Sequence, residues 1–539
     1  MNSNKTALLA PIVIAVAVAV GILAGYRAAH NSQDATTVES SVKGRSTGNK
    51  LDATLQLIGS VYVDSVSPDS LVEELMPELM AHLDPHSVYI PASEMEEVNQ
   101  PLEGEFDGIG VVFNMATDTV IVLNIIAGGP SYKAGILPGD RIITIDSDTV
   151  AGRKVPQNNV VERLRGKRGT KVTVGIERQN VDHLANIDII RDKIPVNSID
   201  AAFMIRPEVG YIKLTNFSRS TRDDFMKELS KLQTKGMSRL IFDLRGNSGG
   251  YLDQAIALAD EFLPEGKLIV YTEDRNGKQT KEFSSGRGSS TEIPLVILID
   301  EYSASSSEIL AGAVQDNDRG LIIGRRSYGK GLVQTQIPFS DGSAIRLTIA
   351  RYFTPTGRSI QKPYKLGEAG YEDDLYNRYL NNEFFSAEGI HFDDSLKYTT
   401  PAGKTVYGGG GIMPDIFVPL DTLEMTPYYY KVNGLNILYR YTIEYTDAHR
   451  RAINRITTLE ELDKFFAADQ RLLDDFVDYA ARKGVTPNTK EIATSARLIR
   501  ALLKGYIGRN TELQDAAYIY EIAPVDNSLS RAIEEIDKI

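Results

Sequence analysis

Two short motifs in this chain carry side chains that could perform hydrolysis. Residues 303–308 read Ser-Ala-Ser-Ser-Ser-Glu and open an apolar stretch, and residues 328–331 read Tyr-Gly-Lys-Gly. No histidine lies near either motif in the sequence. If one of these serines is a nucleophile, Lys330 is its expected base, because a neutral lysine can accept the hydroxyl proton. The pair predicts serine–lysine chemistry rather than a Ser-His-Asp triad.

The serine motif follows an apolar run at residues 294–300, which is typical of a buried strand. The serines should therefore lie at the N-terminus of a helix over residues 303–315, where unpaired backbone N–H groups and the helix dipole favour negative charge. Those donors could stabilise a tetrahedral oxyanion. Glu308 lies three residues after Ser305, on the same helix face, and could orient a catalytic group. Taken alone, the motif is better explained by plain N-capping and small-residue packing, with Glu308 complementing the dipole.

Lys330 stands between two glycines, where the backbone can approach closely. Burial would lower the pKa of its ammonium group, because desolvation penalises the charged form. Gln334 lies four residues further along an expected strand, so it should face the same side as Lys330. The alternative for this motif alone is an ordinary surface lysine in a turn.

Two glycine-containing loops could present backbone N–H groups to an anion. Residues 243–250 lead from a short buried-type strand at 240–244 into an expected helix at 252–263. They do not match the phosphate-loop pattern, and a plain strand–helix turn is the alternative. Residues 107–110, Asp-Gly-Ile-Gly, could capture the terminal carboxylate of a peptide that adds as a strand. A simple hairpin turn is the alternative there.

The elements that must position these motifs change character along the chain. A leucine stripe over residues 71–83 predicts a helix that ends before Pro85. Residues 100–192 alternate short strands, glycine turns and short helices, which indicates a small β-rich module. From about residue 208, strands and helices alternate, which predicts an α/β core with its sites at the carboxyl ends of strands. Residues 424–539 show mostly helical spacing.

The composition excludes several classes of function. The 539 residues exceed the ~100–200 of one domain, so several domains are expected. A net charge of −13 and a pI of about 5.2 argue against a general nucleic-acid binder. The chain has no cysteine, which excludes disulfides, thiolate metal sites, a cysteine nucleophile and a lipidated cysteine anchor.

The N-terminal segment is predicted to enter a membrane. Residues 7–26 carry no charged side chain and follow Lys5, and a run of this length can span a bilayer. We therefore interpret residues 1–26 as an uncleaved signal anchor in preference to a cleaved signal peptide. Residues 27–49, rich in Ser, Thr and Asn, are predicted to form a polar tether.

Taken together and in this order, the motifs resemble those of the carboxyl-terminal processing (tail-specific) peptidases, which place a PDZ domain before a Ser-Lys protease core. The resemblance covers roughly residues 50–420 and does not extend beyond about residue 424. The matching segments are residues 83–87, 105–113, 134–140, 164–166, 243–250, 303–316, 328–335 and 351–359.

The sequence patterns and the resemblance together predict a multidomain α+β chain with an N-terminal anchor helix, and the resemblance implies no metal or cofactor. The predicted parts are a signal anchor or signal peptide (1–26), a linker (27–49), an N-terminal helical region (50–99), a PDZ domain (100–192), an α/β protease core of the crotonase/ClpP-like type (193–423) and a helical C-terminal domain (424–539).

It also implies catalytic roles. Ser305 would be the nucleophile and Lys330 its general base, at the family's usual separation of 25 residues. Gln334 would hold the lysine, and Glu308 would support the serine helix. Family members commonly read Ser-Ala-Ser-Ala-Ser-Glu, whereas Ser306 replaces the second alanine here. On sequence alone, the neighbouring serines of the motif, at 303, 306 and 307, therefore compete with Ser305.

Further groups would bind the substrate. Arg165 matches a position that links the PDZ domain to the active site in some relatives. The groups implied to bind substrate are the N–H groups of Ser306 and of Gly249 or Gly250 for the oxyanion, and Gly108, Ile109, Gly110 and Arg165 for the terminal carboxylate.

The implied function is a serine endopeptidase that recognises protein C-termini and cleaves through an acyl-enzyme. Expected partners are peptides with free C-termini and the membrane, a homodimer is possible, and nucleic acid is excluded. The resemblance places the catalytic domain in the bacterial cell envelope, on the periplasmic side of the inner membrane. Two alternatives are a PDZ adaptor with an inactive core, which loss of Ser305 or Lys330 would indicate, and a crotonase-like acyl-CoA enzyme, against which the anchor and PDZ module argue.

Overall fold

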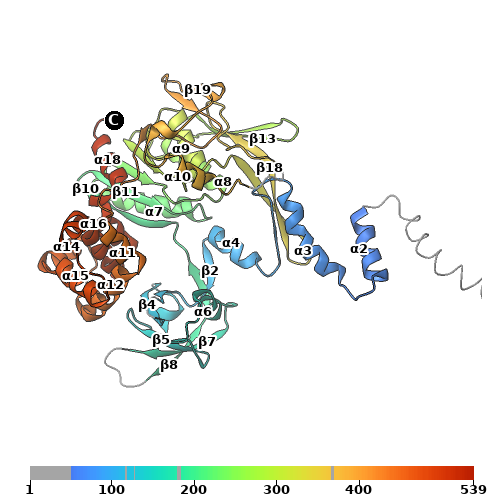
Figure 1. The fold of residues 1–539 in the computed structure, drawn as a ribbon. Coiled ribbons are helices and arrows are strands. Elements are labelled where there is room, and N and C mark those ends of the chain that lie inside the picture. The colour runs from blue at the N-terminus through green and yellow to red at the C-terminus, as the bar shows by residue number, and fades with distance from the viewer. Residues whose placement is uncertain (1–49, 116–117, 127, 179–183, 366–369) are drawn as a thin grey trace, which may run out of the picture. The chain divides into compact units, whose positions relative to one another are not determined.

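The computed structural model describes residues 50–539 except 116–117, 127, 179–183 and 366–369 (Figure 1). The predicted anchor at 1–26 and linker at 27–49 lie outside these residues. In the described part of the chain, no helix is long and apolar enough to cross a bilayer. The chain divides into two compact units, residues 1–83 and 84–539.

The described part of the first unit is a pair of helices, α2 (Lys50–Val61) and α3 (Pro68–Ala81). Ser67 caps α3 with its hydroxyl, as expected for a serine before the first turn. The predicted leucine stripe lies on α3, where Leu75 and Leu79 remain 47% and 49% exposed. The stripe therefore builds no core of its own within this unit.

The β-rich module lies near the start of the second unit, after β1 (Val88–Ile90) and α4 (Met95–Glu103). Its main sheet has the order β3-β4-β5-β7-β8 with antiparallel pairs throughout, β6 pairs with β5, and β2 pairs with β9. Its elements are β2 (Glu105–Gly108), β3 (Val111–Asn114), β4 (Val120–Ile125), α5 (Pro130–Lys133), β5 (Arg141–Ile145), β6 (Asp148–Thr149), α6 (Gln157–Leu164), β7 (Lys171–Glu177), β8 (Ala185–Ile190) and β9 (Asp192–Pro195).

A six-stranded sheet forms the α/β core (Figure 1). The strand order is β10-β11-β12-β15-β16-β21, and every pair from β11 onward is parallel, as the βαβ pattern predicts. The elements are β10 (Ile199–Arg206), β11 (Val209–Leu214), α7 (Thr221–Thr234), β12 (Arg239–Asp243), α8 (Leu252–Phe262), β15 (Leu295–Ile299), α9 (Ser306–Asp316), β16 (Leu321–Gly324) and β21 (Ile416–Phe417).

Both faces of this sheet are buried. Each strand contributes residues to both faces, because successive side chains point to opposite sides. On one face, strand residues such as Phe242 and Ile297 pack with residues of α7, α8 and α9, including Phe225, Phe262 and Leu310. The strand residues of the other face, which alternate with these, form a separate cluster with apolar residues near the C-terminus of the chain. A sheet covered on both sides explains the continuously apolar strands.

A second sheet carries the strand that follows Lys330. It has the order β1-β18-β13-β14, with β17 also paired to β18. Its elements and the smaller ones near it are β1 (Val88–Ile90), α4 (Met95–Glu103), β13 (Leu268–Asp274), β14 (Gln279–Phe283), β17 (Leu332–Pro338), β18 (Ala344–Phe353), α10 (Asp374–Leu380), η1 (Ala387–Gly389), η2 (Asp394–Leu396), β19 (Lys397–Thr399) and β20 (Thr405–Tyr407).

The C-terminal region is helical and has its own apolar cluster, in agreement with the helical spacing of its sequence. Apolar residues of α17 and α18 also join the buried second face of the core sheet. The elements are α11 (Pro427–Gly434), α12 (Ile437–Ala448), α13 (Arg450–Ile453), α14 (Leu459–Ala468), α15 (Leu472–Arg482), α16 (Thr489–Gly508), α17 (Asp515–Ile522), η3 (Ala523–Val525) and α18 (Asn527–Glu535).

Candidate active site

Ser305 lies at the sharp turn between the buried strand β15 and helix α9. Its backbone has φ 54° and ψ −113°, a combination that glycine tolerates and serine rarely adopts. Holding such a conformation costs about 1–3 kcal/mol, and such strain is concentrated at functional sites. A tight strand-to-helix turn is also how other hydrolases expose a nucleophilic serine.

The four serines of the motif have different surroundings. The hydroxyls of Ser303, Ser306 and Ser307 each donate to a backbone carbonyl of the 244–250 loop, at 2.9, 3.0 and 2.9 Å respectively. These three side chains are buried, whereas Ser305 is partly exposed. The structure therefore gives the three competing serines a role in joining the turn to the glycine loop, and it leaves Ser305 accessible to a substrate.

Glu308 joins the two predicted catalytic loops. Its Oε2 accepts the N–H groups of Ser305 at 2.9 Å and Lys330 at 2.8 Å. Its Oε1 accepts the N–H of Gly329 at 2.7 Å and the hydroxyl of Ser327 at 2.5 Å. Burial raises the pKa of Glu308 to about 7, and the four donors oppose that rise because they favour the carboxylate. One side chain thus fixes the serine backbone against the lysine backbone.

Lys330 is held by the glutamine that the strand pattern places on its side. Its Nζ donates to Gln334 Oε1 at 3.1 Å, and the Gln334 amide donates in turn to the carbonyl of His86. Burial lowers the pKa of Lys330, and the nearby guanidinium of Arg346 lowers it further. Both effects favour the neutral amine that a general base requires.

Tyr352, on β18, ties the same two backbones together from another side. Its hydroxyl contacts the carbonyl of Lys330 and lies 3.2 Å from the carbonyl of Ser305. The side chain is buried, so the hydroxyl is shielded from water. Sequence reasoning assigned no role to this residue, although the matching segment 351–359 contains it.

A histidine does reach this site, although none lies near the motifs in the sequence. The turn at residues 84–87 places the His86 imidazole beside Lys330, with Nε2 2.9 Å from the hydroxyl of Tyr371. Burial and the charge of Lys330 lower the pKa of His86 to about 4, so the ring is neutral at neutral pH. His86 and Lys330 line a cavity of about 400 Å³ with Gly246, Ser248, Tyr302, Ala304 and Tyr328. The matching segment 83–87 contained the signal for this residue.

The glycine loop offers Gly250, and not Gly249, as a candidate oxyanion donor. The N–H of Gly249 donates to Asn247 Oδ1 at 2.8 Å and is therefore engaged. Gly250 forms a parallel bridge with Phe217, in which the Phe217 N–H donates to the carbonyl of Gly249. The N–H and carbonyl of Gly250 itself therefore point away from Phe217. On that side its carbonyl accepts the Ser306 hydroxyl at 3.0 Å. The N–H of Gly250 therefore points away from Phe217, to the side on which Ser306 lies.

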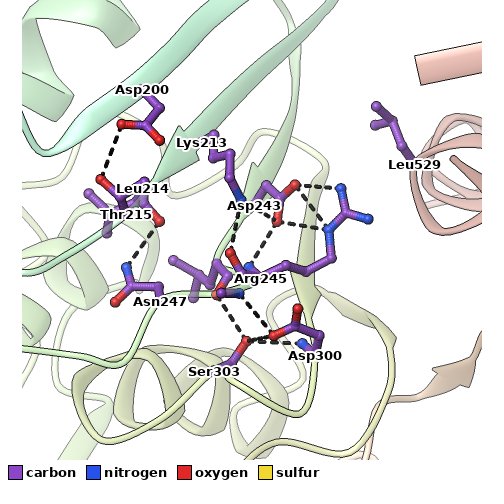
Figure 2. Close-up of polar contacts among 12 residues, drawn as sticks. Asp200, Lys213, Leu214, Thr215, Asp243, Arg245, Asn247, Asp300, Ser303 and Leu529 are labelled. Atoms are coloured by element: carbon purple, nitrogen blue, oxygen red, sulfur yellow. Dashed lines mark hydrogen bonds and ion pairs between the residues drawn. The ribbon is translucent and has the colours of Figure 1, made fainter. Parts of the chain in front are cut away.

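A buried ionic cluster anchors the start of this loop (Figure 2). The Arg245 guanidinium binds the Asp243 carboxylate at 2.6 Å, and Tyr211 donates its hydroxyl to the same carboxylate at 2.6 Å. Burial alone would raise the pKa of Asp243, but the charges of Arg245 and Lys213 hold it well below its usual value. Further along the loop, the Asp300 carboxylate accepts the N–H of residue 246 at 2.9 Å.

The residues expected to bind the terminal carboxylate lie in the β-rich module. Gly108 ends β2, Ile109 is buried in the module's apolar cluster, and Gly110 has φ 73°. The segment 108–110 therefore leads directly into β3. Arg165 donates to the Gln100 side chain at 2.7 Å, and its guanidinium lies 4.8 Å from the ring centroid of the β2 residue Phe106.

Comparison with known families agrees with this architecture. A model described as peptidase family S41 matches residues 208–375, a PDZ-domain model matches residues 108–189, and a family of unknown function matches residues 428–511. A parallel α/β core that presents a serine turn, together with a PDZ domain, defines a serine peptidase of this class.

Two relatives of similar sequence narrow the assignment. The carboxy-terminal-processing protease of Bartonella bacilliformis is 39% identical over 305 residues, which cover 56% of this chain and 69% of that protein. The carboxy-terminal processing protease CtpB of Bacillus subtilis is 32% identical over 352 residues, or 65% and 71% of the two chains. The solved photosystem II D1 C-terminal processing protease aligns over 69% of this chain and 93% of its own, at 24% identity and a TM-score of 0.35. The chain belongs to peptidase family S41, with the carboxy-terminal-processing proteases.

The expected fold class is confirmed for the described residues: a PDZ domain, an S41 protease core and a helical C-terminal region.

Proposed function

We propose that the chain is an endopeptidase that captures protein C-termini through its PDZ domain and cleaves them with a Ser305–Lys330 dyad. The observation that carries the proposal is the Glu308 carboxylate, which binds the backbone N–H groups of both residues. Ser305 is partly exposed, whereas the other serines of the motif are buried. The Glu308 carboxylate holds Ser305 close to Lys330, whose neutral form is favoured by burial. No step of the reaction requires a metal or cofactor.

The reaction follows from these positions. Neutral Lys330 takes the proton of Ser305 Oγ as that oxygen attacks the scissile carbonyl carbon. The carbonyl electron pair moves onto the oxygen, which the N–H groups of Gly250 and Ser306 stabilise. When the oxyanion collapses, the C–N bond breaks, the lysine proton passes to the leaving amine, and an acyl-enzyme ester remains. Water then attacks the ester, with Lys330 accepting the water proton and returning a proton to Ser305.

Substrate capture is assigned to the start of β3 in the PDZ domain. A peptide that pairs antiparallel with β3 would place its terminal carboxylate at the N–H groups of residues 108–110. A route from the PDZ domain toward the active site passes through α4. Arg165 donates to the side chain of Gln100 on this helix. The adjacent α4 residue, Asn99, accepts a hydrogen bond from the side-chain amide of Gln336 on β17 at 3.2 Å. Gln336 lies two residues after the Gln334 that holds the catalytic lysine.

The decisive experiment compares a flexible peptide with a free C-terminus with its C-terminal amide. Wild-type protein should cleave the free peptide with a much lower KM, and a Ser305→Ala variant should cleave neither peptide. Full activity of Ser305→Ala would refute the dyad, and equal KM values for the two peptides would refute carboxylate recognition. Mass spectrometry of peptides retained by Ser305→Ala would then identify the natural substrates.

The inactive-adaptor alternative is disfavoured, because Ser305 and Lys330 are both present and are joined through Glu308. The envelope location, the membrane anchor and the homodimer remain predictions. Fractionation of cells that express the full chain would test the first two, and sedimentation would test the third.

A further inference from the structure

The last helix of the chain, α18, is built into the catalytic core. Its residues Leu529 and Ala532, together with the C-cap Ile536, are fully buried and belong to the apolar cluster on the second face of the core sheet. Matches to the peptidase family end at residue 375, so α18 lies far outside the segment that defines the family. Its burial against the catalytic sheet raises the question of whether it contributes to the active site.

The N-terminus of α18 places one carboxylate against the glycine loop. Asp526 is the N-cap of the helix, and its Oδ1 accepts the N–H of Leu529 at 3.0 Å. The same carboxylate binds the Arg245 guanidinium, with Oδ1 3.0 Å from Nη1 and Oδ2 2.8 Å from Nη2. The side chains of both residues are less than one-fifth exposed. A two-point contact between a guanidinium and a carboxylate fixes the orientation of both groups.

Asp526 also balances the charge of this cluster. Arg245 and Lys213 are the two cations, with Lys213 Nζ 3.7 Å from Asp243 and 2.8 Å from the Arg245 carbonyl (Figure 2). Asp243 and Asp526 are the two anions. Loss of the Asp526 charge would leave Arg245 and Lys213 competing for Asp243, which is costly in a buried cluster.

Arg245 is the residue from which the oxyanion loop departs. The flanking carbonyl of Leu244 accepts the Ser303 hydroxyl at 2.9 Å. Two residues after Arg245, the carbonyl of Asn247 accepts the N–H of Ala304 at 3.0 Å. Displacement of Arg245 would therefore move the backbone that sets both the glycine N–H donors and the turn of the nucleophile.

We propose that Asp526 is a positioning residue of the peptidase, holding the oxyanion loop in its productive geometry through Arg245. The inference rests on the proposed Ser305 chemistry and extends it to the C-terminal end of the chain. Asp526 does not touch the substrate. It acts on the transition state more than on substrate binding, because the loop donors meet the oxygen only when negative charge develops.

The test uses Asp526→Asn in the full chain. Asparagine remains a good N-cap, so the variant keeps the helix start while it loses the carboxylate charge and one of the two oxygens that face Arg245. We expect kcat for a free-carboxylate peptide to fall about tenfold, in the range of residues that act through a network, with KM changed less than twofold. The affinity of a peptide boronic acid, which forms a tetrahedral adduct with the serine, should fall by a similar factor. Asp526→Glu should restore most of the activity.

The matched control is Asp537→Asn. Asp537 follows α18 and forms an ion pair with Arg206 at 2.6 Å, at the end of β10, and it has no contact with the glycine loop among the described residues. This variant should keep wild-type kcat and boronic acid affinity. An unchanged kcat in Asp526→Asn, a loss confined to KM, or an equal loss in Asp537→Asn would each overturn the proposal.

A second measurement separates this inference from the proposed function. Amide hydrogen exchange over residues 244–250 should become faster in Asp526→Asn and not in Asp537→Asn, whether or not the protein cleaves peptides. If wild-type protein shows no peptidase activity, the proposed function fails and this exchange decides the inference alone. Unchanged exchange in Asp526→Asn would then refute the support of the loop by α18.

Discussion

The strained backbone of Ser305 leads to a prediction that separates fold from catalysis. Both Ser305→Ala and Ser305→Gly remove the nucleophile, so both variants should be inactive. Alanine must keep the φ of 54° that serine adopts, whereas glycine reaches this conformation without a clash. The two variants therefore have the same chemistry and differ in backbone strain.

The expected difference in stability is small, and the middle values of the opposing contributions give its sign. Relief of the strain contributes about 1–3 kcal/mol, and the greater freedom of glycine in the unfolded chain subtracts about 0.5–1 kcal/mol. The side chain is only partly buried, so the methyl group of alanine adds less than the ~0.8 kcal/mol of a fully buried carbon. We expect Ser305→Gly to be more stable than Ser305→Ala by about 1 kcal/mol.

The measurement must report on the core alone, because a chain of several domains does not unfold in two states. Native-state hydrogen exchange at amides of β15 and α9 provides that local free energy. The chain has no tryptophan, so tyrosine emission can follow the accompanying urea transition. Equal stability of the two variants, or a less stable glycine variant, would refute a strain at Ser305 that exceeds the combined contributions of glycine freedom and methyl burial.

Other variants test the remaining contacts. Because burial lowers the pKa of Lys330, activity should rise with pH as Lys330 deprotonates, and a flat pH–rate profile would count against this base. Because the pKa of Lys330 is lower in the folded than in the unfolded chain, the fold loses stability as the pH falls through the folded-state pKa. Lys330→Met removes this loss. The variant should be inactive, and urea unfolding should show a larger gain in stability over wild type at pH 6 than at pH 10. Glu308→Gln keeps two of the four hydrogen bonds that the carboxylate accepts. We expect the local free energy of unfolding from core hydrogen exchange to fall by about 2–4 kcal/mol, and kcat to fall as well. Wild-type values of both quantities would refute the role of Glu308 in joining the two loops. Tyr352→Phe should lower kcat about tenfold at nearly constant KM, since one buried hydroxyl is worth about 1–2 kcal/mol, and an increase in KM alone would contradict this. Gly110→Ala should weaken free-carboxylate selectivity, because the added Cβ would lie 2.9 Å from Ile194 Cδ1 at a φ of 73°; unaltered selectivity would argue against this carboxylate site.

The sequence determined those features that depend on local order along the chain. Hydrophobic periodicity predicted β15, α9 and the βαβ core, because strand and helix repeats are local properties. The spacing of lysine and glutamine predicted that Gln334 would face Lys330, and the two side chains are hydrogen-bonded, although Lys330 precedes β17 and the strand register shifts between Val333 and Gln334. The order of motifs indicated the family that the comparisons then showed.

Only the tertiary structure decided which groups meet across distant segments. It buried three motif serines against the glycine loop and left Ser305 accessible. It brought His86 and Tyr352 to the catalytic lysine from segments that are distant from it or from each other in the sequence. It also placed Asp526 against Arg245, 281 residues earlier in the chain. Such contacts arise when whole sheets and helices pack, and the pattern of neighbouring residues does not contain that information.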